Sequence, residues 1–358
     1  MAAPLLTALL ATLPLLQGGD PERLAKNYAT AIEAANRAHA DRPVAKHEHE
    51  LADKLPASAG KLVSELVQAA NSPATLDALA TAGATALDLD RVADFERLRA
   101  RLQELAPERA AQLGIALSRD RFVAQGIGME PAGLAAIADV FDLVLDAYAE
   151  VFALTNFSKV PGKKLRLRVH REAKIDKPPH FAPQFPWHSE IDFPVIDAST
   201  FKSPTADGKF LFYGLCHELG HVIAMWGDRQ NEEDRHAWAH YTGITIVEHL
   251  AATRKEALKD LRDVRWRSVE FDRKRLAAAK VVPGPKDADT VLARLLALHD
   301  ALGPKALGEA LNALDAAGKH QRVNRVRYYA MVEFKAALLA TKAGKAKKKD
   351  VEAAFADR

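Results

Sequence analysis

Two histidines and a glutamate form an H-E-x-x-H motif in the middle of the chain, at His217, Glu218 and His221. Around them, residues 209–226 carry apolar side chains three and four residues apart, which predicts an amphipathic helix. Residues four apart project from one face of a helix, so both imidazoles can reach a single metal ion. Glu218 points away from that pair, in a direction from which it can hold the metal-bound water. The motif therefore predicts a zinc site with Glu218 as the catalytic base.

A catalytic zinc needs a third protein ligand, and the next predicted helix, residues 232–251, offers several. With residues placed at about 100° steps, the apolar side chains of this helix point close to the direction of His236. His236 also lies at the depth that an antiparallel partner of His221 requires. Carboxylates commonly complete a pair of zinc histidines, so Glu233 is the first alternative and His240 the second.

Two plainer interpretations compete with a catalytic zinc. The histidines of the motif can belong to a core helix that binds no metal, or the zinc can be structural or catalytically inactive. For His236 and His240 the competing interpretation is a hydrogen-bonded residue of the core or surface. Metal content separates the first of these interpretations from the others.

Residues 122–241 resemble the zinc metallopeptidases of the zincin group, and most closely the gluzincin branch. In that branch the H-E-x-x-H helix is followed by a helix that carries the third ligand in an E-G-x-A-x-Y block. The run HAWAHY, from His236 to Tyr241, is similar to that block with His in the place of Glu. Either His236 replaces the glutamate, or Glu233 supplies the ligand from one turn earlier. The metzincin pattern is absent, because its third histidine would fall at Gly227.

The resemblance implies zinc-dependent hydrolysis of a peptide bond, with a peptide or protein as substrate and Zn²⁺ as the cofactor. A catalytically inactive metallopeptidase-like binding or interaction protein is the alternative from another class. The resemblance also implies an edge strand above the active-site helix, on which an extended substrate can lie. We expect residues 164–170 to be that strand, with solvated basic side chains. Candidates for stabilising an oxyanion are Tyr241, Tyr328 and Tyr329.

The helices and strands that must position the motif are predicted from the periodicity of apolar residues and from turn residues. Residues 178–187 are rich in proline and predict a loop. The expected elements are strands at 121–124, 164–170 and 191–196, a long amphipathic helix at 131–154, and, after the motif, helices at 292–302, 307–317 and 323–339.

The expected fold class is α+β and predominantly helical: a zincin-like core with a small sheet, the H-E-x-x-H helix and the following ligand helix. Residues 19–117 form a helical N-terminal region whose residues indicate no particular chemistry. Residues 118–341 form the zincin-like domain with helices at its C-terminal end. Residues 342–358 form a basic tail, which we expect to be solvated and partly disordered.

Composition excludes several classes of protein. Fifty Lys and Arg residues against 47 Asp and Glu residues give a net charge of +3, which argues against a charged disordered chain and a dedicated nucleic-acid arm. The single cysteine, Cys216, excludes an internal disulfide framework and a zinc site built from cysteines. No apolar run reaches the ~18 residues of a membrane span, so we expect no integral membrane segment.

The first residues form an uncharged apolar segment, Ala2–Leu16. Its length fits the apolar region of a secretory signal within residues 1–18, and the mature chain would then begin near Gly18. This predicts a secreted or periplasmic protein. The alternative is an uncleaved apolar N-terminus on a cytoplasmic protein.

Overall fold

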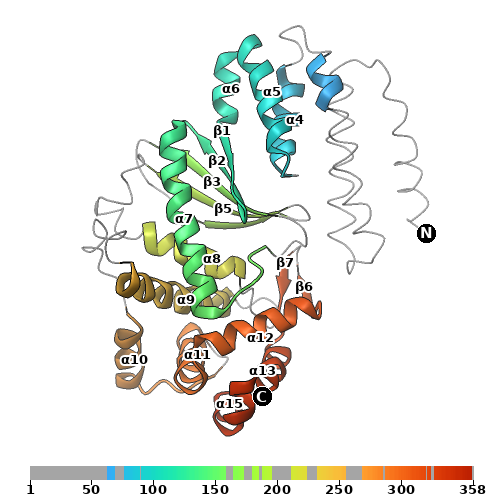
Figure 1. The fold of residues 1–358 in the computed structure, drawn as a ribbon. Coiled ribbons are helices and arrows are strands. Elements are labelled where there is room, and N and C mark those ends of the chain that lie inside the picture. Colours follow the sequence, from blue (N-terminus) through green and yellow to red (C-terminus); the bar gives the residue numbers. More distant parts are fainter. Residues whose placement is uncertain are drawn as a thin grey trace, which may run out of the picture.

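A computed structural model describes residues 63–68, 76–88, 90–158, 164–172, 180–184, 188–195, 211–223, 232–254, 268–284, 287–319, 321–323 and 326–356. The predicted signal, residues 1–18, lies outside these ranges. Within them the chain has the α+β, predominantly helical architecture expected from the sequence. Three layers follow one another in Figure 1: a group of N-terminal helices, a sheet with one long helix across it, and a larger group of helices that carries the motif.

The N-terminal helices have a core of their own. Residues 63–68 are helical, and α4 (Leu76–Asp88), α5 (Val92–Leu105) and α6 (Pro107–Leu113) follow. The apolar stripe of α5 is buried against the neighbouring helices, and Val123 of the sheet joins the same cluster. This region therefore packs on the sheet at the end remote from the motif (Figure 1).

A five-stranded mixed sheet forms the middle layer. The strands are β1 (Ile115–Ser118), β2 (Phe122–Ile127), β3 (Leu165–Arg171), β4 (His180–Gln184) and β5 (His188–Val195), in the order β1-β2-β3-β5-β4. The three central strands are parallel, and the two outer strands are antiparallel to their neighbours. The predicted strands at 121–124, 164–170 and 191–196 correspond to β2, β3 and β5, whereas β1 was not expected.

Helix α7 (Pro131–Phe152) connects the parallel strands β2 and β3 and covers one face of the sheet (Figure 1). Pro131 stands at its first turn, where a missing N–H costs nothing. Its buried stripe packs on the inward side chains Leu165, Leu167 and Val169 of β3. The helix predicted at 131–154 is therefore present, and the alternating pattern of β3 gives the sheet its apolar face.

The expectation that residues 164–170 form the edge strand is wrong. Strand β3 pairs in parallel with β2 on one side and with β5 on the other, so it lies in the centre of the sheet. The edge strand on the motif side is β4, which lies inside the segment expected to be a loop. Its Pro183 is acceptable there, because an edge strand needs no ladder N–H on its outer side. The proline-rich composition thus concealed an edge strand.

The basic side chains of β3 are not all solvated. Arg168 is exposed, but Arg166 is buried and its Nε lies 3.3 Å from a carboxylate oxygen of Glu190 on β5. Arg166 also donates a 2.7 Å hydrogen bond to Gln125 on β2. Since a buried charge needs a partner, this pair corrects the expectation that all the basic side chains of the strand are solvated.

Two antiparallel helices carry the motif and the predicted third ligand. They are α8 (Leu211–Ile223) and α9 (Glu232–Thr253), which pack along each other below the sheet (Figure 1). Helix α8 contacts β4 and β5, and α9 contacts α7 and α11 (Ala288–Leu302). Both helices are thus held between the sheet and the C-terminal helices.

The C-terminal region contains α10 (Val269–Ala278), α11, α12 (Pro304–Ala316), β6 (Gln321–Val323), β7 (Val326–Tyr328), α13 (Met331–Ala340), α14 (Lys342–Ala346) and α15 (Lys348–Ala354). The helix expected at 323–339 is wrong in its first part, where β6 and β7 form a hairpin. The expectation of a partly disordered tail is also wrong for residues 342–356, because Val351 and Phe355 are buried against the helices. Among the described helices, none combines the length and apolarity needed to cross a membrane.

Candidate metal centre

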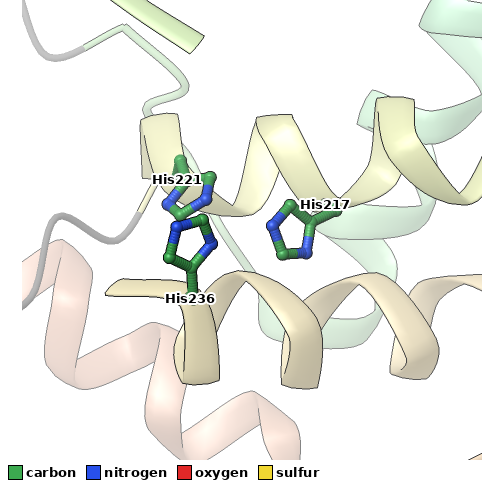
Figure 2. Close-up of side chains that lie close together, drawn as sticks. All are labelled: His217, His221 and His236. Atoms are coloured by element: carbon green, nitrogen blue, oxygen red, sulfur yellow. The ribbon is translucent and has the colours of Figure 1, made fainter. Parts of the chain in front are cut away.

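Three imidazole rings meet where α8 and α9 face each other. His217 and His221 come from α8 and His236 from the first turns of α9, and one ring nitrogen from each lies within 4.8 Å of the others. Figure 2 shows the three rings converging in the space between the two helices. His217 and His221 are half-buried and His236 is exposed. The structure thus brings the two motif histidines together with the residue that the helix geometry ranked first.

The close approach of the two helices depends on small residues. A Cβ atom on Gly220 would lie 2.3 Å from Oγ1 of Thr242 and 2.9 Å from Cα of Ala239. On the other helix, a Cβ atom on Gly243 would lie 3.3 Å from Cα of His217. These glycines therefore let the backbones of α8 and α9 lie close enough for His236 to meet the motif. Neither glycine was predicted from the sequence to have this role, although Gly220 stands inside the motif.

The protonation state of His217 suits a metal ligand. Burial first, and then the neighbouring imidazoles of His236 and His240, lower the pKa of His217 to about 3. The ring is therefore neutral at physiological pH and keeps a lone pair on one nitrogen. Neutral imidazole is the form that binds zinc and other transition metals.

The donor set fits zinc. A tetrahedral zinc with nitrogen ligands at about 2.0–2.1 Å keeps those nitrogens about 3.3 Å apart. The observed limit of 4.8 Å is therefore wider by roughly 1.5 Å, an amount that small ring rotations can close. Among the described residues the group holds three histidines and no further ligand, which matches the open arrangement of catalytic zinc sites. Because imidazole also suits copper, iron and nickel, the donor set alone does not select the metal.

The other predicted site residues lie around this group. Glu218 is half-buried on α8, next to His217, and is not among the three clustered donors. Glu233 belongs to the first turn of α9, and its side chain lies outside the described residues. His240 is not in the cluster either, because its ring is engaged elsewhere. Of the three candidates for the third ligand, His236 alone is seen to converge on the motif within the described residues.

His240 belongs to a chain of hydrogen bonds that was not predicted from the sequence. The hydroxyl of Tyr213, one turn before His217 on α8, lies 3.3 Å from His217 Nδ1 and 2.5 Å from His240 Nδ1. His240 Nε2 in turn lies 2.8 Å from a carboxylate oxygen of Asp272 on α10. The spacing of Tyr213 and His217, four residues apart on one helix, was the only signal available in the sequence.

Asp272 is fully buried and ionised. Burial on its own raises the pKa of Asp272, but the hydrogen bonds from His240 and Arg275, together with the charge of Arg275, lower it by more, so the net shift is downward. Arg275 donates from Nε to Asp272 over 3.1 Å and makes two 2.8 Å hydrogen bonds to Asp289. The carboxylate is therefore fixed from one side by an anchored arginine while it accepts from His240 on the other.

The tyrosines proposed for the oxyanion lie in other surroundings. Tyr241 is fully buried and its hydroxyl lies 2.9 Å from His299 Nδ1 on α11. Burial and the charge of Asp300 raise the pKa of Tyr241. Tyr329 is buried in the C-terminal core, and the side chain of Tyr328 lies outside the described residues. The hydroxyl of Tyr241 thus bonds to a histidine outside the cluster, whereas Tyr213 contacts a histidine of the motif.

No protein-family model matches the chain, and no curated protein is significantly similar to it.

Proposed function

We propose that this chain binds one zinc ion through His217, His221 and His236 and hydrolyses peptide bonds. The observation that carries the proposal is the convergence of three imidazole nitrogens, all within 4.8 Å, from two antiparallel helices. A chance pair of histidines on a core helix needs no third histidine from a neighbouring helix. Two glycines also allow those helices to approach closely at this point, which favours a binding site over a chance cluster.

The chemistry divides between the ion and the side chains. When bound, zinc lowers the pKa of a coordinated water and polarises a carbonyl oxygen. His217, His221 and His236 would hold the ion, and His236 is the exposed member of the three. The carboxylate of Glu218 acts as general base: it takes a proton from the attacking water and delivers it to the leaving amine. A general base does not also have to be a ligand, which agrees with its place outside the cluster.

The substrate class is supported by the neighbourhood of α8. This helix contacts β4, which is the edge strand of the described sheet on that side. A backbone in extended conformation can pair with such an edge by adding one strand. An extended peptide bound along β4 would therefore lie next to the helix that bears the motif.

Elemental analysis and a hydrolysis assay test the proposal together. Purified full-length protein should contain one zinc per chain and cleave unstructured peptides. His217→Ala should lower the zinc content, while Glu309→Gln, an exposed position on α12, should leave content and activity unchanged. Stoichiometric zinc in His217→Ala would contradict the assignment of the ligand. Zinc without any cleavage in the wild type would favour a metallopeptidase-like binding protein.

A further inference from the structure

Tyr213 connects a proposed metal ligand to a residue that does not bind the metal. Its hydroxyl lies 3.3 Å from His217 Nδ1 and 2.5 Å from His240 Nδ1, so it can donate to only one of the two rings and accept from the other. The choice between these arrangements decides which nitrogen of His217 carries a proton. That choice matters for metal binding because a protonated imidazole nitrogen has no lone pair to offer.

Asp272 sets the direction of these hydrogen bonds. An ionised carboxylate only accepts, so His240 Nε2 must donate across the 2.8 Å contact. With a single proton on the His240 ring, the other nitrogen, Nδ1, is an acceptor, and the Tyr213 hydroxyl donates to it. The oxygen of Tyr213 keeps a lone pair that accepts the Nδ1–H of His217. Every donor in the chain thus points from His217 toward Asp272.

The consequence for His217 is a defined tautomer. With its proton on Nδ1, the lone pair of His217 is on Nε2. Figure 2 shows one nitrogen of the His217 ring turned toward His221 and His236 and the other turned away. Since Nδ1 is the nitrogen beside Tyr213, the nitrogen that faces the other two histidines is Nε2.

We propose that Tyr213, His240 and Asp272 form a positioning chain that holds the His217 ring as its Nδ1–H tautomer, with Nε2 presented to the metal. The inference rests on the proposed metal site and assigns to it three residues that do not touch the ion. Arg275 and Asp289 anchor the far end, because Arg275 donates both to Asp272 and, through two hydrogen bonds, to Asp289. Removal of a group that orients a metal-binding histidine commonly lowers the metal affinity 10- to 100-fold.

Tyr241, the residue after His240, offers a matched control for Tyr213. Tyr241 and His299 make a similar hydroxyl-to-Nδ1 contact of 2.9 Å, also between two helices. That pair is directed toward α11 and includes no residue of the histidine cluster. Tyr213→Phe and Tyr241→Phe therefore each remove one hydroxyl bonded to a histidine, and only the first breaks the positioning chain.

The test measures zinc affinity by competition with a chelator, using metal-free full-length protein and Zn²⁺ alone. Tyr213→Phe and His240→Ala should each weaken zinc binding by about 10- to 100-fold, and Tyr241→Phe by less than about 2-fold. The double variant Tyr213→Phe/His240→Ala should bind no more weakly than the weaker single variant, because either change already breaks the chain. Wild-type affinity in Tyr213→Phe, or effects of the two changes that multiply, would overturn the proposal.

A second measurement separates the positioning chain from the metal itself. Nitrogen-15 chemical shifts of the imidazole groups in metal-free wild type should show His217 as the Nδ1–H tautomer. The same shifts in Tyr213→Phe should show loss of that preference, and Tyr241→Phe should match the wild type. If the wild type binds no zinc yet shows this tautomer, the proposed function fails while the hydrogen-bond chain stands. The Nε2–H tautomer in the wild type would overturn the chain.

Discussion

Gly220 on α8 leaves no room for a side chain beside Thr242 on α9, since a Cβ atom there would lie 2.3 Å from the threonine hydroxyl oxygen. The same Cβ atom would lie 2.9 Å from Cα of Ala239, a backbone atom that cannot turn aside. The distance between the two helices is thus set within the H-E-x-x-H motif itself. The motif supplies both the metal-binding side chains and the contact that brings the third histidine to them.

Gly220→Ala should therefore force α8 and α9 apart. We expect a loss of about 1–3 kcal/mol in the free energy of unfolding, the usual cost of overpacking, together with weaker zinc binding. Gly284→Ala is the control, because its Cβ atom would make only ordinary contacts with Thr290, the closest at 3.5 Å. Urea denaturation and zinc titration of both variants measure the effect. Unchanged zinc affinity in Gly220→Ala would show that the helix separation is not critical.

The identity of the third ligand gives a second prediction. His236→Ala should remove stoichiometric zinc, because two histidines alone bind the ion weakly. Glu233→Ala should keep it, since the described geometry already supplies three donors without that carboxylate. Zinc content after dialysis decides between them. Loss of zinc in Glu233→Ala with full zinc in His236→Ala would reverse the assignment.

A third prediction concerns acid stability and Asp272. In the unfolded chain its carboxyl has a pKa near the ordinary value of about 3.9, whereas in the folded protein the hydrogen bonds from His240 and Arg275 outweigh burial and hold the pKa lower. The unfolded state therefore binds the proton more readily. The contribution of Asp272 to stability is complete above about pH 5 and is lost as the pH falls through the lower folded-state pKa.

The Asp272→Asn variant has no carboxyl group at this position to protonate, so it cannot lose stability by this route. Its free energy of unfolding should consequently fall less steeply below about pH 4 than that of the wild type. Urea denaturation of both metal-free proteins across this range measures the two slopes. Parallel slopes would mean that the carboxyl of Asp272 has no lowered pKa in the folded protein.

The buried pair across β3 and β5 gives a fourth prediction. Arg166 and Glu190 are both buried with their charged groups 3.3 Å apart, so removing one leaves the other charge without its partner on the next strand. Glu190→Ala should cost about 3–5 kcal/mol in the free energy of unfolding. The double variant Arg166→Met/Glu190→Leu should recover most of that loss, because neither charge then has to be buried. A double variant as unstable as Glu190→Ala would contradict this account.

The convergence of His236 on the motif was easier to predict from the sequence than the residues around it. The helical period alone was enough to rank His236 above Glu233 and His240, because a single angle and a depth on one helix decide which side chain faces the motif. Tyr213 and Asp272 could not be found in this way. Asp272 lies on another helix, 32 residues after His240, and no local pattern encodes such a contact.

Strands were harder to predict than helices. The alternation of β3 predicts a strand but not its neighbours, and sheet order depends on pairing between distant segments. Strand β4 escaped prediction because its proline is typical of loops, although an edge strand tolerates it. The many lysines of residues 342–356 led to the prediction of a solvated tail. A small number of apolar side chains, among them Val351 and Phe355, is nevertheless enough to pack the last helix on the core.

The most direct test of the central claim is the hydrolysis rate of zinc-loaded Glu218→Gln on an unstructured peptide, relative to zinc-loaded wild type. Glutamine keeps the size of the side chain and removes its basic oxygen, so the variant should fold and hold one zinc per chain. We predict a rate at least ~10²-fold below that of the wild type, the usual contribution of a general base. An undiminished rate in Glu218→Gln would contradict the proposed mechanism whatever metal the protein binds.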